Sequence, residues 1–394
     1  MTPTARPTGT PDATGTDGDV IARLAGIAPG SPLAATWATR PAVILHTGGS
    51  FAALFAPHDP AGLDHGEREA AALRVAAIEG ATAAAAWHRE RLRAAGAGDA
   101  EIAAIERVSG DGGDAALSPR LAAILRHTDL LTRTPGAATP AHLAALKAAG
   151  LGPREIVALS QLIAYMGYAV RLLAGLRVLD ATPEDTAAAP PPSMPEPANG
   201  GSSRPAGTPR FTMDVLAWRP WLETVDDTGA SPEQAALVGR VAPSPESRPY
   251  YALLAHDAPA LEERTALFNA IMYGPGGVRR SDRELASTAA SLVNGCVYCT
   301  SVHARRYAQL TKDAPTMQGL LDNGLSAELP GRERAIADYA VRLTENPAGL
   351  TARDLGAMRA AGLSDAEIHD VTLATAMFAW ANRLMQTLGE GVNT

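Results

Sequence analysis

The chain has 394 residues and a formal net charge of −8 at pH 7, and 46% of its residues are hydrophobic but only 5% are aromatic. This length allows two or more domains, and the abundance of alanine favours closely packed helices, so we expect an all-α protein. The acidic balance, without a basic cluster, argues against nucleic acid as a partner.

Residues 1–18 are mostly Thr, Pro, Gly and Asp, a composition that predicts a disordered tail. They lack the apolar segment of a signal peptide, and we find no uninterrupted apolar run of about 18 residues in the chain. We therefore expect a cytoplasmic protein with no membrane partner. In a reducing compartment, a cysteine pair is more often catalytic than structural.

Apolar periodicity and turn residues predict a first helical domain over residues 19–180. Short helices are expected between 20 and 56, and longer helical stretches at 67–96, 118–134, 140–149 and 153–178. Residues 181–210 are rich in Pro, Gly and Ser and poor in large apolar residues, which predicts a flexible linker.

A second helical domain is expected over residues 211–394. It opens with the sequence FTMDVLAWRPWLE, whose Trp218 and Trp221 should pack on the domain core. Apolar periodicity predicts helices at 232–240, 260–273, 281–293, 296–311, 331–345, 351–361 and 364–388.

The residues best suited to chemistry lie in the second domain. The two cysteines of the chain, Cys296 and Cys299, stand between Glu284 and His303. In a helix that starts at Cys296, the side chains of Cys296, Cys299 and His303 fall within an arc of about 60°.

Glu284 would lie about 18 Å from Cys296 along one unbroken helix. The Asn294–Gly295 pair is typical of a helix that ends in a left-handed residue. We therefore predict one helix that carries Glu284, a break, and a second helix that starts at the cysteines and folds back. Both thiols would then lie in a first turn, where free N–H groups and the helix dipole favour thiolate.

Two structural interpretations of the cysteines fit less well. A structural zinc site needs four protein ligands and usually two cysteine pairs, and the sequence holds one pair. A disulfide between residues three apart closes too short a loop to stabilise the fold much. The sequence therefore favours redox chemistry.

The spacing of Glu284, Cys296, Cys299 and His303 resembles the active-site motif of the AhpD-like alkylhydroperoxidases in the carboxymuconolactone decarboxylase superfamily. The resemblance implies that Glu284 and His303 form a proton relay, that Cys299 attacks a peroxide, and that Cys296 closes the disulfide. It also implies an external dithiol electron donor, lipoyl- or thioredoxin-like, and no metal, flavin or nicotinamide cofactor. The superfamily often builds trimers and hexamers, so we expect a homo-oligomer, with a trimer favoured.

The residues between the cysteines depart from the family pattern, because characterised members can carry a histidine there. Tyr298 takes part of that space and is a candidate substrate-binding residue, with Trp380 and Asn382. If the last helix packs on the cysteine helix as in the family, Phe378, Trp380 and Met385 would line an apolar approach. Asn382, a polar residue in an apolar stretch, should make a specific hydrogen bond.

The two halves of the sequence match each other, which predicts an internal duplication. Residues 147–176 align with 359–388, and both segments begin with a shared AAGL. Upstream of these segments, the alignment continues if the offset between the halves changes by three residues. It then pairs Glu69 with Glu284, Gly80 with Gly295 and His88 with His303. Ala81 and Ala84 fall at the cysteine positions.

We therefore expect two homologous AhpD-like helical domains in tandem, the first without redox cysteines. Two interpretations of Glu69 and His88 stay open: a hydrogen-bonded pair that joins two helices, or a proton-transfer site without thiols, as in the decarboxylating branch of the superfamily.

The predicted function is reduction of hydrogen peroxide or an organic hydroperoxide through a dithiol–disulfide cycle. One alternative is a dithiol–disulfide oxidoreductase partner that does not itself react with peroxide. Another is a cofactor-free lyase or isomerase that uses only glutamate and histidine.

Overall fold

The computed structural model of the chain describes residues 19–107, 116–181 and 210–393. The predicted tail at 1–18 and the predicted linker, apart from its two end residues, therefore lie outside the described residues. The all-α prediction is confirmed, because the described residues form helices and one small two-stranded sheet.

The described helices of the first half, in chain order, are α1 (Val20–Ala25), α2 (Pro32–Ala38), α3 (Pro41–Phe55), α4 (His65–Ile78), α5 (Thr82–Ala94), α6 (Asp99–Glu106), α7 (Pro119–Arg133), α8 (Pro140–Ala148) and α9 (Pro153–Asp180). The elements of the second half are β1 (Leu216–Pro220), α10 (Val225–Thr228), α11 (Pro232–Val241), α12 (Arg248–Leu254), α13 (Ala258–Met272), α14 (Arg280–Val293), α15 (Val297–Thr311), α16 (Ala314–Asn323), α17 (Gly331–Glu345), α18 (Gly356–Ala360), α19 (Asp365–Thr387) and β2 (Gly389–Asn393).

Helix starts follow local capping chemistry. Ser364 accepts from the N–H of Glu367 at 3.3 Å, and the Glu367 carboxylate accepts from the N–H of Ser364 at 2.9 Å. This capping box satisfies N–H groups that have no partner within the helix and fixes the start of α19. The stretch predicted as one helix at 351–361 is instead a 3₁₀ turn, Ala352–Leu355, followed by the short α18.

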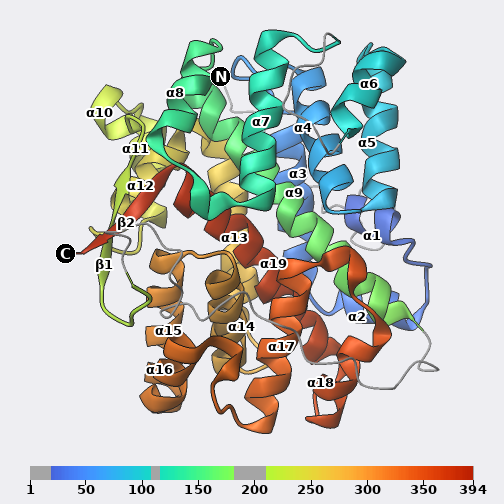
Figure 1. Ribbon diagram of the computed structural model, residues 1–394, viewed down its shortest axis with the longest axis vertical. Coiled ribbons are helices and arrows are strands. Elements are labelled where there is room, and N and C mark those ends of the chain that lie inside the picture. Colours follow the sequence, from blue (N-terminus) through green and yellow to red (C-terminus); the bar gives the residue numbers. More distant parts are fainter. Residues whose placement is uncertain (1–18, 108–115, 182–209, 394) are drawn as a thin grey trace, which may run out of the picture.

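The centre of the molecule is formed by α9 and α19, one long helix from each half (Figure 1). Both are buried on nearly all sides, as expected for helices that are apolar all round. α9 is also the one described helix long and apolar enough to cross a membrane, and 94% of its most apolar stretch is buried in the protein.

One large hydrophobic core runs through both halves, and a second, smaller cluster lies within the first half, between α4, α5, α6 and α7. Besides the contact of α9 with α19, α3 of the first half packs along α13 of the second. In the alignment predicted from the sequence, α9 corresponds to α19, so these two helices face each other across the boundary between the halves.

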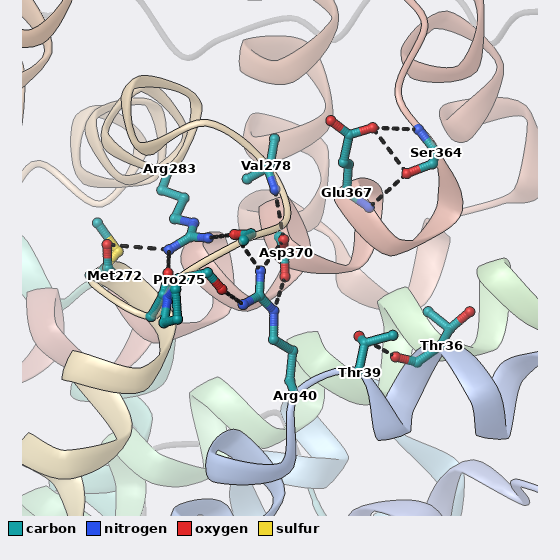
Figure 2. Close-up of polar contacts among 12 residues, drawn as sticks. Thr36, Thr39, Arg40, Met272, Pro275, Val278, Arg283, Ser364, Glu367 and Asp370 are labelled. Carbon is teal, nitrogen blue, oxygen red and sulfur yellow. Dashed lines mark hydrogen bonds and ion pairs between the residues drawn. The ribbon is translucent and has the colours of Figure 1, made fainter.

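A polar cluster also joins the halves (Figure 2). Arg40, at the start of α3, donates from Nε to Asp370 Oδ1 of α19 at 2.6 Å and from Nη1 to the Pro275 carbonyl at 3.0 Å. Asp370 Oδ2 accepts from the N–H of Val278 at 2.8 Å, and Arg283 donates to carbonyls of the same loop. The first half thus helps to hold the loop from which α14 starts.

The small sheet was not predicted from the sequence. β1 and β2 pair antiparallel, with Leu216 opposite Asn393 and Pro220 opposite Gly389. Trp218 of β1 is 2% exposed and donates from Nε1 to the Met385 carbonyl at 2.9 Å, which confirms its predicted core position. Trp221 is half-buried against the same core.

Candidate active site

The predicted break between the glutamate helix and the cysteine helix is present. α14 ends at Val293 with Asn294 as its C-cap, and Gly295 follows with a φ of 73° in the left-handed region. The N–H of Gly295 bonds to the Leu292 carbonyl at 3.1 Å and the N–H of Cys296 to the Ser291 carbonyl at 2.9 Å. This is the Schellman pattern, which lets α15 start at once and fold back along α14.

The cysteines lie at the start of α15, as predicted. Cys296 is the N-cap, and its Sγ accepts from the N–H of Cys299 at 3.4 Å. Both thiols are free and buried, with 1% and 4% of the residue exposed. At this helix N-terminus, an otherwise unpaired N–H group therefore points toward the Cys296 sulfur.

Glu284 and His303 meet across the two helices. Glu284 Oε2 lies 2.5 Å from His303 Nδ1, and Glu284 Oε1 accepts from Arg280 Nε at 2.9 Å. Burial opposes ionisation of Glu284, but His303 and Arg280 outweigh it and hold the pKa of this carboxyl below its ordinary value. The carboxylate therefore stays charged and orients the imidazole, which leaves Nε2 available for proton transfer.

The thiol of Cys299 is in an environment that disfavours charge. Burial raises the pKa of Cys299 well above its usual value, the neighbouring Cys296 adds to the rise, and the positive charge of Arg264 opposes it. Ionisation of Cys299 therefore needs a base and a source of positive potential. His303, four residues further along α15, is placed on the same side of the helix for the first role.

The last helix does pack against the cysteine helix. Phe378 of α19 lies edge-on to the His303 ring, with ring centroids 4.4 Å apart. Asn382 accepts from Ser291 Oγ of α14 at 3.0 Å, so it makes the specific hydrogen bond expected of it, and its Nδ2 is buried without a partner.

The other candidate substrate residues have different surroundings. Trp380 is fully buried and donates from Nε1 to Gln161 of α9 at 2.9 Å, and its ring packs against Tyr165, so it lies between the halves. Tyr298 is half-buried in the first turn of α15, where β2 covers it closely: a Cβ at Gly391 would lie 3.2 Å from the Tyr298 Cβ. Met385 is half-buried against the core.

Two site residues were missed in the sequence. Arg280 stands four residues before Glu284, a helical spacing that was available as a signal. Arg264 lies on α13, and nothing in its local sequence marks it.

The first half holds a similar glutamate–histidine geometry without cysteines. Glu69 Oε2 of α4 lies 2.7 Å from His88 Nδ1 of α5, so the predicted hydrogen bond between two helices is present. Arg91 donates from Nε to the other Glu69 oxygen at 2.7 Å. Burial lowers the pKa of His88, which favours a neutral imidazole beside the Glu69 carboxylate.

The backbone beside this pair also repeats the Schellman pattern. Gly80 has a φ of 68°, and the N–H of Ala81 bonds to the Ala76 carbonyl at 2.9 Å. Ala81 and Ala84 occupy the places that the cysteines take in the second half.

Over residues 19–107, 116–181 and 210–393, no group of three or more His, Cys, Asp or Glu side chains is arranged to hold a metal ion. The chemistry available to the described site is that of two thiols, one carboxylate and one imidazole.

Comparison with known proteins agrees with the predicted resemblance. Residues 258–341 match the model of the carboxymuconolactone decarboxylase family, a range that contains all four motif residues. No curated protein matches the chain.

Two solved structures are similar to part of the chain. An uncharacterized peroxidase-related protein from Silicibacter sp. TM1040 is 28% identical over 34% of this chain and 70% of its own, with a TM-score of 0.32. An uncharacterized peroxidase-related protein from Ralstonia eutropha JMP134, described as an alkylhydroperoxidase AhpD core, is 28% identical over 35% of this chain and 73% of its own, with a TM-score of 0.33.

Proposed function

We propose that the chain is a thiol-dependent peroxidase for hydrogen peroxide or organic hydroperoxides, of the AhpD-like type that its motif resembles; the match of residues 258–341 to the carboxymuconolactone decarboxylase family supports this proposal. The observation that carries the proposal is the juxtaposition of a reduced cysteine pair at a helix N-terminus with a buried Glu284–His303 hydrogen bond of 2.5 Å.

The cycle uses each group in turn. His303 accepts the proton of Cys299, and the thiolate attacks the outer oxygen of the hydroperoxide, which breaks the O–O bond. Cys299 becomes a sulfenic acid, and the leaving alkoxide or hydroxide takes the proton to give alcohol or water. The thiol of Cys296 then condenses with the sulfenic acid, which forms the disulfide and releases one water. An external dithiol reduces the disulfide by exchange and is itself oxidised.

We also propose that the two halves descend from one duplicated domain and that the first has kept the framework without the redox chemistry. The repeated helix break and Glu–His hydrogen bond support this proposal. A half without cysteine cannot run a dithiol cycle, so its Glu69–His88–Arg91 group is assigned a structural role.

Rapid mixing of the fully reduced protein with hydrogen peroxide and with cumene hydroperoxide tests the proposed function. We expect loss of the two thiols and formation of one disulfide per chain, with two equivalents of water from hydrogen peroxide, or one of alcohol and one of water from cumene hydroperoxide. The Cys296→Ala/Cys299→Ala double variant should not react. Turnover retained in the double variant would support the lyase or isomerase instead, and thiols that exchange with dithiols but ignore peroxide would support the oxidoreductase partner.

The pH dependence follows from the raised pKa of Cys299. The protonated thiol predominates at pH 7, and the thiolate fraction grows about tenfold for each pH unit below the pKa. The second-order rate constant for oxidation by hydrogen peroxide should therefore keep rising from pH 6.5 to about pH 9. Stopped-flow fluorescence of the reduced protein measures it; a plateau already at pH 7 would show that the thiol is ionised there and contradict the prediction.

A further inference from the structure

A cavity with an aromatic wall lies between α11 and α13 of the second half. Its volume is about 320 Å³, a size typical of pockets that hold small organic molecules. The wall includes the rings of Tyr251, Phe268 and Tyr273. Tyr273 is 51% exposed, so part of an aromatic surface is left uncovered at this place. Such rings suit the apolar body of a ligand.

The same wall contains a buried positive charge, that of Arg264. The residue is 4% exposed, and it makes no hydrogen bond or ion pair with any residue that the structure describes. Its protein contacts are two rings, with Cζ 5.5 Å from the centroid of Tyr250 and 5.8 Å from that of Trp380. Rings offset only part of the cost of removing a guanidinium from water, so buried arginines are normally paired with an anion.

The free donors of Arg264 face the cavity. Its Nε is sealed from solvent, whereas the two Nη groups, which also lack a partner in the described structure, keep contact with solvent. Since Arg264 is a wall residue of the cavity, the cavity provides that contact. Two neighbouring N–H donors match the two oxygens of a carboxylate, and one guanidinium balances its single negative charge.

The cavity is close to the candidate active site on two sides. The ring centroid of Phe268 lies 6.2 Å from that of Phe378, which is 4.4 Å from the centroid of His303. On the other side, Arg280 Cζ lies 4.2 Å from the ring centroid of Tyr273, and Arg280 bonds to the glutamate that pairs with His303. Single side chains therefore separate an occupant of the cavity from the glutamate–histidine pair.

We propose that the cavity is a binding site for a small organic carboxylate. The carboxylate is held by the Nη groups of Arg264, and an aromatic body packs against Tyr251, Phe268 and Tyr273. Such a ligand supplies the negative charge that the described side chains do not give to Arg264. The site goes beyond the proposed peroxidase function, because it uses neither cysteine and its test needs no peroxide.

Isothermal titration calorimetry of the full chain with sodium benzoate tests the inference, with benzamide and acetate as matched probes. Benzoate has both parts of the proposed ligand, whereas benzamide lacks the charge and acetate lacks the ring. We expect benzoate to bind with a Kd of about 1 mM or tighter. Each matched probe should bind about tenfold or more weakly than benzoate.

Substitutions in the wall show which groups hold the ligand. Arg264→Met should weaken benzoate binding by about 10- to 100-fold, because it removes a charge-assisted pair of hydrogen bonds. Arg264→Lys keeps the charge but not the two-pronged donor, so it should restore part of the affinity. Tyr273→Ala removes an exposed ring of the wall and should weaken benzoate binding by about two- to fivefold.

Arg240→Met is the matched control. Arg240 is an exposed arginine at the rim of the same cavity, where it pairs with Glu262 at 2.5 Å. An exposed ion pair contributes little, so this variant should bind benzoate within about twofold of the parent. Thermal unfolding shows which variants are folded. If Arg264→Met does not fold, Arg264→Lys and Tyr273→Ala carry the test.

Absence of saturable benzoate binding, or an unchanged Kd in folded Arg264→Met, would overturn the inference. An unchanged Kd in both Arg264→Lys and Tyr273→Ala would do the same, as would benzamide or acetate that binds as tightly as benzoate. If benzoate binds as expected but no hydroperoxide oxidises the protein, the carboxylate site stands and the proposed peroxidase function fails.

Discussion

Replacing Cys299 by serine is expected to abolish reaction with hydroperoxide, whereas Cys296→Ser should still consume about one equivalent of peroxide and stop as a sulfenic acid. Cys299 is one turn before His303 on α15 and feels the charge of Arg264, so it has both a base and a positive potential. Cys296 is the N-cap, with its sulfur beside the N–H of Cys299, a position suited to closing a disulfide.

Mass spectrometry of the two serine variants after one equivalent of peroxide, with dimedone to trap sulfenic acid, distinguishes the roles. A dimedone adduct on Cys299 in the Cys296→Ser protein and an unmodified Cys299→Ser protein are the expected pair of results. The assignment would be reversed by an adduct on Cys296 when serine replaces Cys299.

Glu284→Gln should slow peroxide turnover by about 100-fold or more, the usual scale for loss of a positioned acid–base group. The amide keeps the shape of the side chain but loses the negative charge that pairs with Arg280 and His303. The imidazole would lose the partner that fixes its orientation and supports its protonated form during the reaction.

The chain supplies its own matched control in Glu69→Gln. Glu69 makes the same contacts, to His88 and Arg91, in a half without thiols. This variant should lower the melting temperature while turnover stays within about twofold of the parent, since a broken buried pair costs stability. Steady-state turnover and thermal unfolding of both variants give the comparison; a large loss of turnover with unchanged melting in Glu69→Gln would make the first half a participant in the chemistry.

The site was predictable where local geometry decides it. The Asn294–Gly295 pair predicted the helix break and the return of the second helix, and the resemblance to the AhpD-like motif implied the pairing of Glu284 with His303 that the structure contains. Apolar periodicity likewise located α9 and α19 to within a few residues.

The rest of the site depends on contacts between distant segments. Arg264 is a charged residue on a helix of ordinary composition, and its burial follows from the packing of α13 against α19 and α12. The strands β1 and β2 lie at opposite ends of the second half and pair over five residues only, a length at which strand propensity carries little information. Arg280 is different, since its spacing from Glu284 is local.

The packing of α9 on α19 resembles a dimer interface, but the two halves it joins are covalently linked in one chain. In a dimer formed by free chains, the fraction assembled falls on dilution, and any site supported by the interface weakens with it. Here the partner helix belongs to the same polypeptide, so its local concentration is set by the chain and not by the amount of protein in solution. Arg40 and Gln161 belong to the first half and contact residues of the second. Each copy of the second half therefore always has one copy of each of these contacts. A first half held in this way can support the second through the fit of its helices alone, without cysteines of its own.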